Sequence, residues 1–239
     1  TVYRKHHFLL AIRIKPAACR FGKPPHGAFT TQTREVLDMS GEQAWRAAEE
    51  AYRIESDAIL HALRGISREE FLRAVSVLKN APRIAASGCG HSGICCQHFA
   101  HLMCCIERPA RFISPAEAVH GATGFLQCGD VMLLASRGGK TAELIPILSI
   151  CKEKGVTVIA VTEDPDSPLA KGADIVLQML VTKEVDRFNM QGTTSFTVLS
   201  VLFDALQAAL IVETEYQSEQ FALIHPGGAV GARLNHTKP

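Results

Sequence analysis

The sequence predicts an α/β fold: a three-layer α/β/α sandwich with a roughly five-stranded parallel sheet, preceded by N-terminal helices. From residue 83 onward, short runs that are apolar throughout alternate with segments of helical periodicity. Such runs are typical of strands buried on both faces, and the helices between them provide the crossovers that parallel strands need. The 239 residues, 47% hydrophobic and 21% charged, suffice for one large domain or two small ones.

The N-terminal stretch differs from the rest of the chain. Residues 1–34 contain seven basic and no acidic residues, although the whole chain carries a net charge of only +1. The first methionine is Met39. We expect a basic N-terminal extension over residues 1–38, disordered or not native to the protein, and one domain over residues 39–239. The near-neutral total argues against nucleic acid as the main partner, because no basic excess is present to neutralise phosphates.

Two helices are expected ahead of the sheet. Ser40 is in position to cap the first, and apolar residues such as Trp45, Tyr52 and Leu63 recur at helical spacing after it. The helices expected along the chain cover residues 41–63, 68–79, 92–106, 141–154, 165–171 and 193–214. The strands expected between them cover residues 83–87, 110–114, 130–136, 156–162 and 174–180.

Three segments at the carboxyl ends of the expected strands are rich in glycine and hydroxyl residues. They are residues 87–93 (SGCGHSG), 135–143 (ASRGGKTAE) and 191–195 (QGTTS). Ligands of parallel sheets bind at this edge, and backbone N–H groups at helix starts favour anions there. Their convergence predicts a cleft for a phosphorylated ligand.

Two stretches of the sequence resemble nucleotide-binding motifs but lack a residue that each motif needs. Residues 88–93 match G-x-G-x-x-G, but Ser114 stands where a dinucleotide site needs an acid for the ribose, and Glu117 comes too late. Residues 139–141 (GKT) resemble the end of a P-loop, which would need glycine in place of Leu134. We therefore expect a smaller ligand and no cofactor, with a nucleotide-dependent oxidoreductase as a remaining alternative.

The cysteines admit a metal site or ordinary packing. The segment with most of them also carries His98 and His101, and His101 lies one helical turn before Cys105. Structural zinc usually takes ligands from two separate elements, so we favour a packed helix face and expect no metal. No secretory signal is visible and no apolar run looks long enough to span a membrane, so we expect a reduced, cytoplasmic protein without a membrane partner. The eight cysteines, expected to be mostly small buried hydrophobes, are Cys19, Cys89, Cys95, Cys96, Cys104, Cys105, Cys128 and Cys151.

Several motifs in order resemble those of one family: GCGHSG, SPAEAVHGATG, GDVMLLASRGGKTAEL, GVTVIAVTEDPDSPLAKGADIVL, VTKE and FALIHPGGAVGARL. On these motifs, residues 41–234 resemble a SIS (sugar isomerase) domain, most similar to the arabinose-5-phosphate isomerase family. The tandem regulatory (CBS) domains often fused after this point in the family are not in this sequence. The resemblance implies a flavodoxin- or Rossmann-like sandwich that binds a sugar phosphate and works as a dimer or tetramer.

The resemblance also implies roles for individual residues. The family's active-site acids map to Glu143 and Glu184 and its histidines to His120 and His225, and His225 is expected to reach the cleft of a neighbouring subunit. The residues implied in ligand or phosphate binding are Ser92, His91, Ser136, Arg137, Gly138, Gly139, Lys140, Thr141, Thr193, Thr194 and Ser195.

Two loops depart from the family pattern. The first loop usually reads G-x-G-K-S-G, and this chain has His91 at the lysine position. The phosphate loop usually reads S-N-S-G-E, and residues 136–140 here read SRGGK. A hydroxyl is lost at Gly138, and a positive charge replaces an acid at Lys140. We expect Arg137 and Lys140 to compensate by charge-assisted contacts with phosphate oxygens.

The chemistry expected is an aldose–ketose isomerisation through an enediol, which needs a base to move a proton between C1 and C2. Glu184 is our first choice of base, with a pKa raised by desolvation, and a structural role is its alternative. Glu143 is expected in the first turn of its helix, where the helix dipole alone would explain an acid. His225 would open the sugar ring, with His120 assisting. The alternative function is a non-catalytic sugar-phosphate binding or sensing protein.

Overall fold

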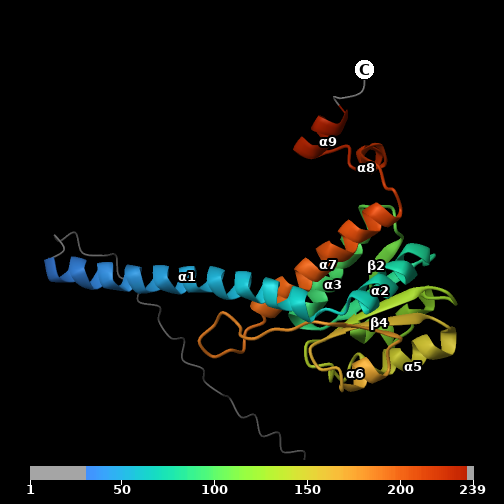
Figure 1. Cartoon of the computed structure of the whole chain (residues 1–239), viewed down its shortest axis with the longest axis horizontal. Coiled ribbons are helices and arrows are strands. Elements are labelled where there is room, and N and C mark those ends of the chain that lie inside the picture. The colour runs from blue at the N-terminus through green and yellow to red at the C-terminus, as the bar shows by residue number, and fades with distance from the viewer. Residues whose placement is uncertain (1–30, 236–239) are drawn as a thin grey trace, which may run out of the picture. The chain divides into compact units, whose positions relative to one another are not determined.

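The computed structural model describes residues 31–235 of the chain (Figure 1). The chain divides into two compact units, Thr1–Ala44 and Trp45–Pro239, and helix α1 (Thr31–Gly65) contributes residues to both. Residues 1–30 of the expected extension lie outside the described residues. Ser40 lies inside α1, so the prediction that it begins the helix is wrong. The segment from residue 31 to residue 40 contains neither proline nor glycine and continues the helical turn.

The sheet has five parallel strands in the order β2-β1-β3-β4-β5, which confirms the predicted class. The strands end between two residues before and one residue after their expected C-terminal boundaries. Their bounds are β1 (Ile84–Gly88), β2 (Ala110–Phe112), β3 (Val131–Ala135), β4 (Thr157–Thr162) and β5 (Ile175–Gln178).

Helices cover both faces of this sheet, and successive strand residues point to opposite sides (Figure 1). Leu133 packs with Phe99 and Phe203 in one core, whereas the adjacent Leu134 packs with Ile147 in the other. The first core lies under α2 (Arg68–Asn80), α3 (Gly90–Cys104) and α7 (Thr194–Glu213). The second lies under α5 (Ile145–Lys154) and α6 (Pro168–Lys171), with α4 (Pro115–Ala118) and the 3-10 helix η1 (Ala122–Phe125) beside it.

The cysteines divide by burial. Cys95, Cys96 and Cys151 are fully buried, as expected of small hydrophobes. Burial raises the pKa of the Cys151 thiol to about 12, so this thiol stays protonated at neutral pH. Cys104 and Cys128 are exposed, and for these two the expectation is wrong. Cys19 lies outside the described residues.

Several other helices differ from expectation: α4 was not predicted, and α6 begins at Pro168 and not at residue 165. Helix α5 begins at Ile145, because residues 141–144 form a turn. Helices α8 (Ser218–Ile224) and α9 (Gly228–Asn235) follow α7 and were not predicted.

By length and composition alone, α7 is apolar enough to cross a membrane, so the prediction that no such run exists is wrong. The core helix of a soluble protein passes the same test, and α7 buries Leu199, Phe203 and Leu206 in the first core.

Candidate active site

The first two of the three expected loops lie side by side at the carboxyl edge of the sheet. Gly88 pairs in register with Ala135, so the loops that follow β1 and β3 start next to each other. A Cβ at Gly88 would lie 3.0 Å from the carbonyl oxygen of Ala135, which is why this approach needs glycine. Across the two loops, burial first and then the charge of Glu143 raise the pKa of the Cys89 thiol. The charge of Glu143 therefore acts on Cys89 in the first loop.

The loop after β3 folds into a tight turn around a pair of hydroxyls. The Ser136 and Thr141 hydroxyl oxygens are 2.8 Å apart, and the Gly139 N–H donates to the Ser136 hydroxyl at 3.1 Å. Gly139 has a φ of +62°, and a Cβ there would collide with the Ser167 side chain. Within residues 31–235, the backbone N–H groups of Gly138, Lys140 and Thr141 have no hydrogen-bond partner. Free amides beside two hydroxyls are typical of a phosphate site, and we call residues 136–141 the phosphate loop.

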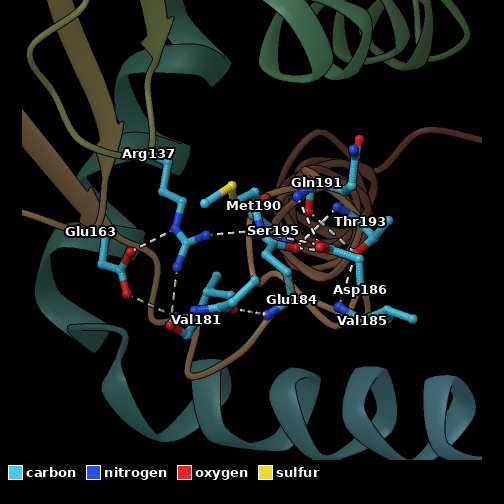
Figure 2. A network of polar contacts seen from close by, with 11 residues as sticks. Arg137, Glu163, Val181, Glu184, Val185, Asp186, Met190, Gln191, Thr193 and Ser195 are labelled. Atoms are coloured by element: carbon cyan, nitrogen blue, oxygen red, sulfur yellow. Dashed lines mark hydrogen bonds and ion pairs between the residues drawn. The ribbon is translucent and has the colours of Figure 1, made fainter.

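Glu184 occupies the N-terminus of α7 (Figure 2). Its side chain is 1% exposed. One carboxylate oxygen, Oε2, accepts hydrogen bonds from the Thr193 N–H at 3.0 Å, the Thr193 hydroxyl at 3.2 Å and the Ser195 N–H at 3.1 Å. The other, Oε1, accepts from Nη1 of Arg137 at 2.6 Å. The positive end of α7 is thus filled by the protein's own anion.

The pKa of Glu184 is lowered, and this corrects the expectation of a raised value. Burial on its own would raise the pKa, but hydrogen bonds from Ser195, the charge of Arg137 and the Thr193 hydroxyl outweigh it. A buried, ionised carboxylate with both oxygens engaged does not suit a general base, which must reach a substrate proton.

The Arg137 side chain leaves the phosphate loop toward two carboxylates, Glu163 and Glu184 (Figure 2). Its Nε donates to Glu163 at 2.8 Å, its Nη1 to Glu184, and its Nη2 to the Val181 carbonyl at 3.4 Å. Arg137 contacts protein oxygens in this structure, and its expected contact with phosphate oxygens stays a prediction. Lys140 is 70% exposed and pairs with Asp164 at 3.1 Å, so it is the cation of the loop that lies open to solvent.

The start of α7 is less open than expected. The Thr193 hydroxyl and the Ser195 N–H are engaged by Glu184. Thr194 is fully buried, and its hydroxyl has no partner among the described residues. The expected phosphate contacts of these three residues stay a prediction, since three of the donors at the helix start already bind the Glu184 carboxylate.

One of the predicted histidines, His91, lies in the first loop. His91 is exposed at the start of α3, and its ring lies edge-on to Phe196 with centroids 6.2 Å apart. A Cβ at Gly192 would be 2.8 Å from His91 Nδ1, so His91 joins the first loop to the segment before α7. Ser92 follows it and is half-buried. His120 is exposed in the turn after α4.

Helix α8 lies at the C-terminal end of α7, away from this site in its own chain (Figure 1). His225 is the residue that follows this helix. Its ring stacks on Phe221 with centroids 4.9 Å apart. Gln220 of the same helix donates to Glu107, just past the C-terminal end of α3, whereas the first loop is at the opposite end of α3. Helix α7, about 30 Å long by its 20 residues, separates α8 from Glu184.

Residues 77–209, a little over half of the chain, match the model of the SIS domain family. The chain belongs to the SIS domain family. Arabinose 5-phosphate isomerase KdsD of Pseudomonas aeruginosa is 38% identical over 189 residues, which are 79% of this chain and 58% of the relative. The SIS chain thus spans a little over half the length of the curated relatives it matches.

Solved SIS structures resemble the chain closely. A Listeria monocytogenes protein described as a candidate sugar-phosphate isomerase superposes with a TM-score of 0.74 at 38% identity, covering 83% of this chain and all of that one. An Escherichia coli CFT073 protein solved in complex with a sugar-phosphate ligand gives a TM-score of 0.73 at 28% identity, covering 77% of this chain and 98% of that one. The family expected from the sequence motifs is confirmed.

Sequence reasoning missed two acids at the carboxyl edge of the sheet. Glu163 and Asp164 follow β4 directly and pair with Arg137 and Lys140. The signal was present, because the expected strand 156–162 is followed by two consecutive acids at the carboxyl edge.

Proposed function

We propose that this SIS chain is a phosphosugar aldose–ketose isomerase that acts through an enediol. The observation that carries the proposal is the phosphate loop, where two hydroxyls lie beside free amides, with the exposed Glu143 two residues after it. The relatives named as arabinose 5-phosphate isomerases and the neighbour solved with a sugar-phosphate ligand support a sugar phosphate as the substrate. The substrate would be a monophosphate of a pentose or a hexose, and no cofactor or metal takes part.

Phosphate binding falls to the phosphate loop. The Ser136 and Thr141 hydroxyls and the free N–H groups of Gly138 and Lys140 would hold the phosphate oxygens, and the Lys140 ammonium would balance their charge. His91 and Ser92, across the cleft on the first loop, would contact sugar hydroxyls. This arrangement leaves the sugar chain between the two loops.

Proton transfer falls to Glu143. Glu143 is exposed and its charge acts on Cys89 in the first loop, whereas Glu184 is buried and both of its oxygens accept hydrogen bonds. As base, Glu143 would take the proton from C2 of the aldose and return it to C1, while His120 would move the hydroxyl proton from O2 to O1. Glu184 would organise the cleft as a fixed anion.

A second copy of the chain would complete the site. His225 lies at the far end of α7 from the cleft of its own chain, so it would open the sugar ring in a neighbour's cleft. The same helix exposes Leu223 (77%) and Ile224 (44%), apolar side chains that a dimer or tetramer would cover. We propose a cytoplasmic homo-oligomer, which the mass measured by light scattering would test.

Purified chain incubated with a panel of pentose and hexose phosphates provides the test, with isomeric products followed by NMR. We expect turnover of at least one aldose phosphate. Glu143→Gln should lower kcat by about 10²–10⁴-fold without loss of fold, because the side chain is exposed. Absence of turnover with every sugar phosphate would contradict the proposal.

The alternative is a non-catalytic sugar-phosphate binding or sensing SIS protein. It is favoured by His91 and Lys140 at positions where the family pattern has lysine and an acid, and by the engagement of Glu184. Saturable binding of a sugar phosphate without any product in the same panel would select it.

A further inference from the structure

We propose that Arg137 is a positioning residue: it keeps Glu184 seated on the N-terminus of α7, and so leaves the phosphate loop to receive the substrate's phosphate. The effect of this role on turnover rests on the proposed isomerase function. The effects on Glu184 and on phosphate binding do not rest on that function, because they follow from contacts within the chain.

Two hydrogen bonds to its carbonyl oxygen hold the backbone of Arg137 in place. Its carbonyl oxygen accepts the Glu163 N–H at 2.8 Å and the Thr162 hydroxyl at 3.0 Å. Both donors lie at the end of β4, the neighbour of β3. The side chain therefore starts from a point that two adjacent strands hold, directed toward the residues after β5.

The guanidinium then joins three segments. It binds Glu163 and Glu184 with separate nitrogens and reaches the Val181 carbonyl with a third contact. Glu163 in turn accepts the Val181 N–H at 3.3 Å. A planar fork with several donors satisfies two carboxylates and a carbonyl at once, which a lysine ammonium does with less geometric precision.

The segment from Glu184 to α7 is organised around the carboxylate that Arg137 holds. The Glu184 N–H donates to Asn189 at 2.7 Å, and the Val185 N–H donates to the Thr193 hydroxyl at 3.1 Å, the same hydroxyl that contacts Glu184. Loss of the guanidinium would leave a buried carboxylate with one bare oxygen. This segment would then loosen first.

Two places at this edge of the sheet suit an anion, the start of α7 and the phosphate loop. By holding Glu184 at the start of α7, Arg137 leaves the phosphate loop free. The start of α7 holds the Glu184 carboxylate, whereas the phosphate loop has free amides. Arg137 lies between them but directs its donors to protein oxygens. A ligand with one phosphate therefore binds at the loop without touching Arg137.

The test uses full-length chain, inorganic phosphate as probe, and the variants Arg137→Gln and Arg137→Lys. Arg83→Gln is the matched control, because Arg83 (37% exposed) pairs with the fully buried Asp130 at the opposite edge of the sheet. Three quantities are measured: the pKa of the Glu184 carboxyl by carbon NMR, hydrogen exchange of the Thr193 and Ser195 amides, and phosphate affinity by phosphorus NMR.

In Arg137→Gln we expect the pKa of Glu184 to rise and exchange of the two amides to accelerate by about tenfold or more. Phosphate affinity should change less than about threefold, because the loop is intact. Arg137→Lys, which keeps the charge and loses the fork, should lie between Arg137→Gln and the parent. Arg83→Gln should change none of the three quantities.

A fall in phosphate affinity of about tenfold or more, with unchanged exchange at residues 193 and 195, would make Arg137 a phosphate ligand and overturn the proposal. If Arg137→Gln does not fold, Arg137→Lys decides by the same readouts. Where turnover is measurable, Arg137→Gln and Glu184→Gln should lower kcat by similar factors with little change in KM, and the double variant should be no worse. If the losses of kcat in the two single variants multiply in the double variant, the proposal is also overturned. If no sugar phosphate is turned over, the isomerase proposal fails while the NMR and exchange results still decide the role of Arg137.

Discussion

Two arginine–carboxylate pairs lie at opposite edges of the same sheet and have almost the same burial. At the carboxyl edge Arg137 is 35% exposed and Glu184 1%; at the amino edge Arg83 is 37% exposed and Asp130 0%. They differ in how fully the carboxylate is satisfied. Both oxygens of Glu184 accept hydrogen bonds, whereas Oδ1 of Asp130 has no partner within residues 31–235.

The difference separates a pair that organises a site from one that fastens strands. Asp130 accepts the Gln127 N–H and pairs with Arg83, which directly precedes β1, so this pair ties the starts of β1 and β3. Glu184 instead caps a helix and gathers the residues before it. A buried ion pair offsets its desolvation only when the remaining lone pairs are satisfied, so the carboxyl-edge pair is the stronger of the two.

The largest effect should come from removing each carboxylate. Glu184→Leu should lower the free energy of unfolding by about 3–5 kcal/mol, because the half-buried Arg137 and the amides at the start of α7 lose their acceptor. Asp130→Leu should cost less, about 1–3 kcal/mol, since one oxygen is already bare. Urea unfolding of both variants gives the comparison. If the Asp130 variant is as unstable as the Glu184 variant, the conclusion that the Arg137–Glu184 pair is the stronger one is wrong.

A smaller effect is expected within the phosphate loop. Gly139→Ala should cost about 1–3 kcal/mol and weaken phosphate binding, because φ is positive and the new Cβ would collide with Ser167. Gly138→Ala is the control, with nothing within 4 Å of the new Cβ. Unfolding and phosphate titration should separate the two alanine variants; equal effects would show that the turn is not constrained as described.

The pH dependence of stability should carry the signature of Glu184. Its pKa in the folded chain lies below the ordinary 4.5, so its contribution is fully present above pH 4.5 and is lost as the pH falls through the folded value. The free energy of unfolding of the parent should therefore fall more steeply on acidification below pH 4.5 than that of Glu184→Gln. Parallel curves would show that this carboxyl does not contribute.

The smallest effect is expected at Lys140. Lys140→Gln should weaken inorganic phosphate binding by about three- to tenfold and leave stability within about 0.5 kcal/mol, because its pair with Asp164 is exposed. Lys171→Gln, which breaks an exposed pair with Asp166, is the matched control and should not affect phosphate. Equal phosphate affinity in the two variants would exclude Lys140 from the site.

The sequence predicted the sheet well because its signals are local. Continuously apolar runs place all five strands, and glycines mark the loops after β1 and β3. The carboxylate partners of Arg137 were not predicted, because Glu163 and Glu184 lie 26 and 47 residues away, beyond any local pattern. The predicted direction of the Glu184 pKa shift was wrong for the same reason. Its burial was expected, but the hydrogen-bond donors at the start of α7 were not.

The carboxylate at the start of α7 also acts as a tethered competitor. A group held by a segment of chain competes with dissolved anions at the effective concentration that its tether sets. Glu184 is joined to the helix it caps by nine residues, 185–193. The start of α7 is therefore closed to dissolved anions by competition, while the phosphate loop, which has no such tethered rival among the described residues, stays available.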